Sequence, residues 1–138
     1  MASSTMIDRA PWHHWPVAVF AFLFYLIAVL DYILSKLNIG AYTANFPPDF
    51  VAFVQDLPLW LDVVWAVGVW GGLLGAFLLF QRNRWSVLCL FTGTCILAFP
   101  TVWLALFVRP TIFSLAGLSG FFTMLGTTAI SALFYLYA

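Results

Sequence analysis

The chain has 138 residues, of which 64% are hydrophobic and only 7% are charged, and its formal net charge is zero. Because soluble domains carry about a quarter charged residues, this composition excludes an ordinary water-soluble domain. The balanced charge and the lack of a basic block also argue against a nucleic-acid partner. We therefore expect a single all-α domain over residues 1–138, an integral membrane protein in contact with the lipid bilayer.

Four apolar segments are each long enough to cross a bilayer as a helix, which takes about 20 residues. They cover residues 16–37, 59–80, 85–108 and 112–137. The last three are joined by connections of a few residues, so we expect them to be antiparallel neighbours in a four-transmembrane-helix bundle. The first segment is too long for the apolar part of a signal peptide, and we expect an uncleaved helix.

The longest connection lies between the first two segments and contains a Pro-Pro-Asp sequence at 47–49. Proline in the first turn and an acid near the positive end of the helix dipole are typical of a helix start. Apolar residues then recur at helical spacing, with Gln55 and Asp56 on the other side. The pattern predicts a short interfacial helix over 48–57 in the first periplasmic loop, and a lid over the bundle is the alternative.

The basic residues of the short connections predict the orientation, because cytoplasmic loops carry an excess of Lys and Arg. Arg9, Arg82 and Arg84 fall on one predicted side of the membrane, and Lys36 and Arg109 fall on the other. This distribution favours N- and C-termini that both lie in the cytoplasm.

Asp31 and Asp62 lie inside predicted transmembrane helices, where a charge is costly and usually faces a partner or water. Asp31 is about 9 Å of helix rise from the outer end of the first helix, and Asp62 lies in the first turn of the second. Tyr32 and Arg109 are predicted at the same end. These four residues either form a mouth for an ion, a proton or a hydroxyl-rich solute, or have structural roles. In the structural alternative Asp62 stabilises the start of its helix, and Lys36 and Arg109 snorkel to the interface or neutralise Asp31.

Small residues recur at four-residue spacing on the second and fourth predicted helices, a pattern that lets helix backbones approach closely. The glycines assigned to this helix-packing or partner face are Gly68, Gly71, Gly72, Gly75 and Gly120. Such a face either closes the bundle or binds a membrane-protein partner or a second copy of the chain. The sequence leaves these alternatives open.

No motif predicts catalysis. The two histidines, His13 and His14, precede the first predicted helix, which argues against a transmembrane haem held by axial histidines. Cys89 and Cys95 are six residues apart on one helix, about 9 Å along it and beyond disulfide reach. There is no phosphate-binding loop, HExxH sequence or nucleophile elbow. We therefore expect no enzyme activity, no metal site and no cofactor.

Several short motifs lie between residues 12 and 100. They are WHHW at 12–15, Asp31-Tyr32, Tyr42, Phe46-Pro47, Pro58-Leu59-Trp60, WAVGVWGG at 65–72 and Arg84-Trp85. Together they resemble a family of small, uncharacterised bacterial four-helix inner-membrane proteins that are often labelled as sugar transporters. The resemblance implies a bacterial cytoplasmic-membrane location and contributes no established catalytic residue.

The absence of catalytic groups, the small extramembrane mass and the glycine-lined faces predict a non-enzymatic accessory or assembly subunit that packs against a larger membrane complex. A small oligomeric transporter or permease for a small polar, sugar-like solute is the alternative, since two copies would supply eight helices. Against a transporter, no charged or amide side chain lies near the predicted membrane centre.

Overall fold

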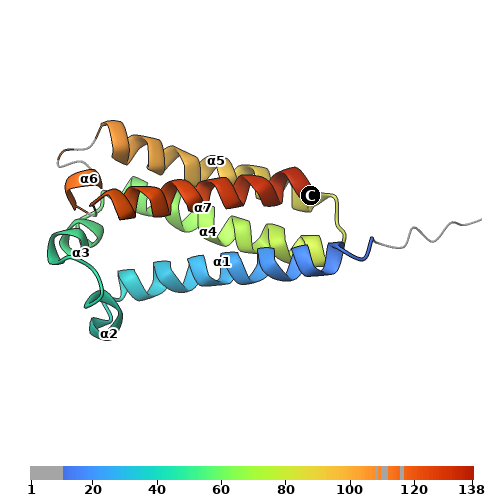
Figure 1. The fold of residues 1–138 in the computed structure, drawn as a ribbon, viewed down its shortest axis with the longest axis horizontal. Helices are drawn as coiled ribbons and strands as arrows, with labels where there is room; N and C mark the ends of the chain where they lie inside the picture. Colours follow the sequence, from blue (N-terminus) through green and yellow to red (C-terminus); the bar gives the residue numbers. More distant parts are fainter. Residues whose placement is uncertain (1–10, 108, 110–111, 116) are drawn as a thin grey trace, which may run out of the picture.

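The computed structural model describes residues 11–107, 109, 112–115 and 117–138, and the regular elements in these ranges are all helices. Four of them are long: α1 (His14–Lys36), α4 (Leu59–Phe80), α5 (Trp85–Leu106) and α7 (Gly117–Tyr137). They run the length of the molecule as a bundle (Figure 1). Each is long and apolar enough to cross a membrane. The structure confirms the predicted all-α, four-helix membrane fold, in which each span satisfies its own backbone hydrogen bonds.

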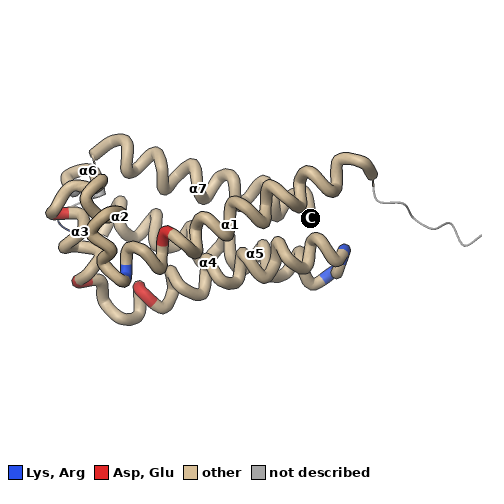
Figure 2. The backbone as a smooth tube through the Cα atoms, turned by 90° about the horizontal axis from the view of Figure 1, so that it is seen from below, with Lys and Arg blue, Asp and Glu red and all other residues tan. Residues whose placement is uncertain are grey.

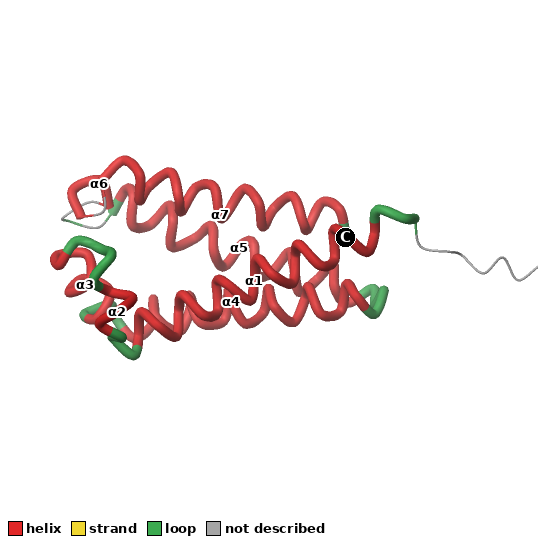
Figure 3. Tube along the Cα trace, turned by 60° about the horizontal axis from the view of Figure 1, so that its bottom comes forward, coloured by secondary structure: helices red, strands yellow, loops and turns green. Residues whose placement is uncertain are grey.

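Two short helices, α2 (Gly40–Thr43) and α3 (Pro48–Gln55), fill the connection between α1 and α4. Helix α3 starts at the predicted proline, carries Asp49 in its first turn, and ends two residues before the predicted end at 57. Helix α2 is a single turn, which is too short for a periodic pattern to reveal. Both lie across one end of the bundle, and Figure 3 shows that the connections are confined to its two ends.

The fourth predicted helix, 112–137, is interrupted in the structure. It is divided into α6 (Ile112–Leu115) and α7, which begins at Gly117. Gly117 has a φ of +69°, a left-handed conformation that glycine adopts readily and that breaks a right-handed helix. The membrane span is therefore the 21-residue α7 alone, about 30 Å long and still sufficient to cross a bilayer.

The other predicted boundaries differ only at helix ends. Helix α1 begins at His14, two residues before Pro16, because a proline is tolerated in a first turn. Helix α5 ends at Leu106, and Val108, the predicted end, lies outside the described residues. Helix α4 has the predicted bounds. It ends in a Schellman motif, in which Arg82 has a φ of 53° and the Asn83 amide donates to the Leu78 carbonyl at 3.0 Å.

Helix α4 packs between α1 and α5, and α5 packs against α7. Helices α4 and α5 approach each other closely, because a Cβ added at Gly93 would lie 3.2 Å from the Gly72 backbone nitrogen. This is the close packing that small residues at helix crossings allow. The main apolar core lies among α1, α4 and α5 and includes Tyr25, Val69, Leu90 and Leu97.

Helix α3 packs onto the end of the bundle. Its Val54 is buried, and its Phe50 and Phe53 pack against a second cluster built on Leu61 and Leu104. The apolar face predicted for this segment is therefore partly covered by the bundle.

Candidate functional site

Acidic side chains gather toward one end of the bundle, where Lys36 also lies. Figure 2 shows acidic residues toward the end that carries α2 and α3, and basic residues in the α4–α5 connection at the opposite end. The described acids are Asp31, Asp49, Asp56 and Asp62. The N-terminal end of α1 and the chain's C-terminus lie at the basic end (Figure 1). The polar groups near α2 and α3 are therefore the main candidate for a functional site, and we call this region the acidic end.

Asp31 is held by a residue outside the membrane spans. The Tyr42 hydroxyl of α2 donates a hydrogen bond to Asp31 Oδ1, and both side chains are half-buried. Burial raises the pKa of Tyr42 to about 12, and the hydrogen bond to Asp31 and the negative charge of Asp31 add to the rise. The Tyr42 phenol therefore keeps its proton at neutral pH and remains a donor to the carboxylate.

Asp62 is paired with Lys36. The Lys36 Nζ atom lies 3.4 Å from Asp62 Oδ2, and the two side chains are 24% and 19% exposed. Tyr32 lies beside Asp62. Its ring packs edge-on against the Trp65 ring, with centroids 4.9 Å apart. The other carboxylate oxygen, Asp62 Oδ1, is buried and has no hydrogen-bond partner among the described residues. Buried polar atoms normally have a partner, so this oxygen is the least satisfied polar group of the acidic end.

A further hydrogen bond ties the outer end of α1 to α3. The Gln55 side-chain amide donates to the Ser35 carbonyl at 2.5 Å. This carbonyl is one of those that the end of a helix leaves without an intrahelical partner. No periodic pattern predicts the contacts of Gln55 and Tyr42, because these two residues lie in the short helices of the connection and their partners lie 20 and 11 residues away in α1.

The structure divides the four residues predicted at this end. Asp31 is joined to Tyr42, while Asp62 is joined to Lys36 with Tyr32 beside it. Arg109 is exposed after α5, and among the described residues the one ion pair is that of Lys36 with Asp62. Neutralisation of Asp31 by Lys36 or Arg109, which one alternative included, is not seen among the described residues, where the Tyr42 hydroxyl bonds Asp31 instead.

Most of the predicted glycine face is covered within the chain. A Cβ at Gly68 would meet Ile96 at 3.0 Å, and one at Gly75 would meet Leu90 at 2.9 Å. A Cβ at Gly72 would collide with the Tyr25 ring. Gly71 instead faces open space, because a Cβ there would meet nothing within 4 Å. Gly120 is half-exposed on α7.

A buried group of hydroxyls joins α1, α5 and α7 near the middle of the bundle. The Tyr25 hydroxyl lies 2.5 Å from Ser131 Oγ, which lies 2.9 Å from Thr94 Oγ1. Toward the acidic end, Thr101 and Thr128 bond each other at 3.2 Å. In the low dielectric of a membrane interior, such paired hydroxyls connect helices.

The histidines lie at the basic end and contact protein. His14 Nε2 lies 3.1 Å from the Leu79 carbonyl, and both His13 and His14 pack against the ring of Tyr137. Within the described ranges, no group of three or more His, Cys, Asp or Glu side chains is arranged to hold a metal ion.

Comparison of the chain with protein-family models, curated proteins and solved structures gives no match. The resemblance noted from the sequence motifs therefore stays a prediction, and the assignment of function rests on the chain's own geometry.

Proposed function

We propose that the protein is a non-enzymatic accessory or assembly subunit of a larger bacterial inner-membrane complex, and that α7 is the helix that binds the partner. The observation that carries this proposal is the exposure of α7. Of its described side chains, only that of Ser131 is buried, whereas α4 and α5 each bury seven residues. It is also the least hydropathic of the four candidate spans.

The exposed surface of α7 has the chemistry of a helix-packing face. Thr123 and Thr127 lie one turn apart and bond carbonyls of their own helix at 2.9 and 2.8 Å. Gly126 is beside them, and a Cβ there would meet nothing within 4 Å. Small side chains whose hydroxyls are hydrogen-bonded allow a second helix to approach closely. Lipid chains make less van der Waals contact with such a surface than with Leu or Phe side chains.

The proposed orientation places the basic end in the cytoplasm. The Arg82 and Arg84 connection lies at this end with both the start of α1 and the C-terminus, and cytoplasmic loops are enriched in such residues. The acidic end, with α2 and α3, would then face the periplasm.

The test is native-gel electrophoresis with mass spectrometry on tagged protein extracted from its own membranes in mild detergent. We expect co-migration with a larger complex, and loss of that complex in Gly126→Leu. Gly71→Leu is the matched control, because both glycines face open space but lie on different helices. A complex that survives in Gly126→Leu would exclude this face of α7 as the contact.

The second candidate is a small oligomeric transporter or permease for a small polar, sugar-like solute. The observation that favours it is the buried, unpartnered Asp62 Oδ1 beside Lys36. A carboxylate oxygen in this position can accept a hydrogen bond from a solute hydroxyl or take up a proton. Asp31, deeper along α1, would line the same mouth.

Uptake of labelled monosaccharides into liposomes tests this candidate. We expect Asp62→Asn and Asp31→Asn to abolish uptake without changing expression or oligomeric state, while Asp56→Asn, an exposed acid of the same end, retains it. A native-gel band containing only copies of this chain would favour transport over the accessory role. Loss of the folded protein in Asp31→Asn would instead identify a structural residue.

A further inference from the structure

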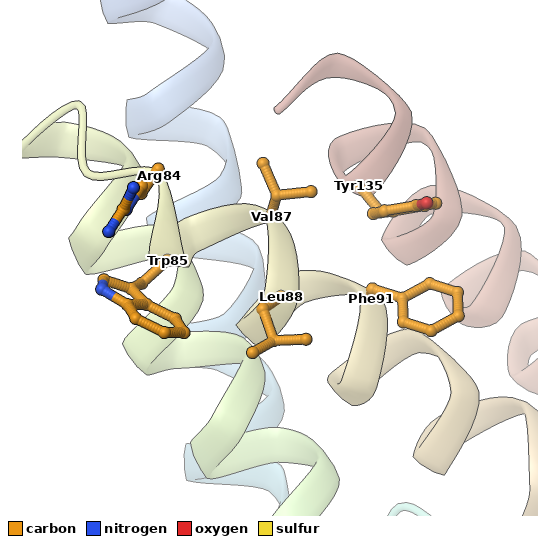
Figure 4. Close-up of a pocket in the computed structure, with 6 residues that line it drawn as sticks. All are labelled: Arg84, Trp85, Val87, Leu88, Phe91 and Tyr135. Carbon is orange, nitrogen blue, oxygen red and sulfur yellow. The ribbon is translucent and has the colours of Figure 1, made fainter.

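A groove opens at the basic end between the start of α5 and the last turns of α7. It has a volume of about 390 Å³ and is lined by Arg84, Trp85, Val87, Leu88, Phe91 and Tyr135 (Figure 4). This volume lies in the range of small-molecule and cofactor sites. The accessory function proposed above does not use the groove, which lies on another part of the molecule than Gly126.

One end of the groove is cationic. The Arg84 guanidinium carbon lies 5.8 Å from the centroid of the Trp85 ring, and both side chains are exposed. The Asp side chains of the described residues all lie toward the opposite end of the bundle (Figure 2). Among the described residues Arg84 forms no ion pair, and its fork of N–H donors suits a phosphate group.

The rest of the groove is apolar and follows the helix axis. Leu88 lies one turn from Arg84, and Phe91 lies seven residues away, which is about 10 Å along the helix. The Phe91 ring packs against the Tyr135 ring of α7 with centroids 5.0 Å apart, so the groove is bounded by two spans. An arginine and a tryptophan at the end of a membrane helix mark the level of the lipid headgroups. The apolar strip therefore points from the headgroup level toward the bilayer interior.

We propose that this groove binds an anionic glycerophospholipid, with its phosphate at Arg84 and one acyl chain along Leu88 and Phe91. The charge and the apolar strip are both needed for this assignment. A water-soluble anion would use the arginine alone. A zwitterionic lipid would gain less from an exposed arginine, since basic residues at the membrane surface favour anionic lipids.

The test is native mass spectrometry of the delipidated full-length protein in non-ionic detergent, titrated with dioleoyl phosphatidylglycerol or dioleoyl phosphatidylcholine. We expect preferential retention of phosphatidylglycerol, and a loss of about fivefold in its affinity in Arg84→Gln, which corresponds to one surface arginine. Arg109→Gln, an exposed arginine at the other end, is the matched control and should bind as the wild type does. Equal retention of the two lipids, or unchanged binding in Arg84→Gln, would overturn the proposal.

Two further measurements separate the headgroup from the chain. Phe91→Ala should weaken retention of phosphatidylglycerol, whereas inorganic phosphate at the same concentration should not raise the thermal unfolding temperature of the wild type. An Arg84-dependent stabilisation by phosphate alone, equal to that by the lipid, would identify a free-anion site and refute the lipid assignment. Size-exclusion chromatography of each ligand-free variant checks that the bundle is folded.

Discussion

The ring of Tyr25 in α1 lies directly against the backbone of Gly72 in α4, and its hydroxyl bonds Ser131 of α7. One side chain therefore contacts two other spans near the middle of the bundle. Tyr25 is fully buried, and so is Ser131. The absence of a side chain at Gly72 provides the space for the ring, and the ring in turn places the hydroxyl where α7 presents its serine.

Adding a methyl group at Gly72 should destabilise the bundle. In Gly72→Ala the new Cβ would overlap the Tyr25 ring, and overpacking of a well-filled core costs about 1–3 kcal/mol. Gly71→Ala is the matched control, because its Cβ would meet nothing within 4 Å, and alanine is the better helix former by about 1 kcal/mol. Thermal unfolding in detergent measures the difference. Equal unfolding temperatures for the two variants would show that α1 does not pack on Gly72 in this way.

This contact makes Gly72 unsuitable for testing a partner-binding face. A bulky residue at Gly72, such as leucine, should unfold the bundle before it reports on any assembly. Gly126 and Gly71 face open space and are the informative positions for a partner.

The buried hydrogen bond between Tyr25 and Ser131 should contribute a modest coupling energy. We expect Tyr25→Phe and Ser131→Ala to show a coupling of about 0.5–1.5 kcal/mol in a double-mutant cycle, because interhelical hydrogen bonds in membrane proteins contribute about this much. Thr123→Ala removes an exposed hydroxyl that bonds its own helix and should be nearly neutral. The free energies of unfolding come from denaturant titration in mixed micelles. Strict additivity of the two buried substitutions would argue against the Tyr25–Ser131 bond.

Removing the cation of the acidic end should cost more than removing its carboxylate. Lys36→Gln leaves the half-buried Asp62 charge without its partner, and stranding such a group costs about 1–3 kcal/mol. Asp62→Asn removes the charge that most needs a partner, so we expect a smaller loss. The double variant should recover part of the stability lost in Lys36→Gln. If Lys36→Gln unfolds at the wild-type temperature, the 3.4 Å pair contributes nothing to stability.

The Tyr42–Asp31 bond predicts a loss of stability at alkaline pH. Because the folded-state pKa of Tyr42 is raised to about 12 from the ordinary value of 10.0, its contribution is complete below pH 10 and is lost as the pH rises from 10 to 12. Tyr42→Phe should remove this part of the pH dependence and lower the stability at neutral pH. Asp31→Asn should reduce it, since the charge that opposes ionisation is gone. Thermal unfolding between pH 9 and pH 12 makes the comparison, and identical pH profiles for wild type and Tyr42→Phe would contradict the bond.

The sequence by itself determined the architecture. A chain with four apolar segments of about 20 residues has one stable solution in a bilayer, because only helices satisfy their own backbone hydrogen bonds there. The bounds of α4 follow from Pro58 and from the Gln81–Arg84 connection, and the start of α3 follows from Pro48. The hydropathy of the sequence did not predict the break at Gly117, because glycine is common in membrane spans and a positive φ does not change the hydropathy.

Only the tertiary structure decided what each polar or small residue contacts. Periodicity placed four glycines of α4 on one helix. It could not show that Gly72 packs against Tyr25, that Gly68 and Gly75 pack against α5, and that Gly71 faces open space. It placed Asp31 and Asp62 at one end, yet the partner of Asp31 is Tyr42 in a one-turn helix. Such contacts depend on the rotation and crossing of packed helices, and these follow from side-chain shape across the whole bundle rather than from local sequence.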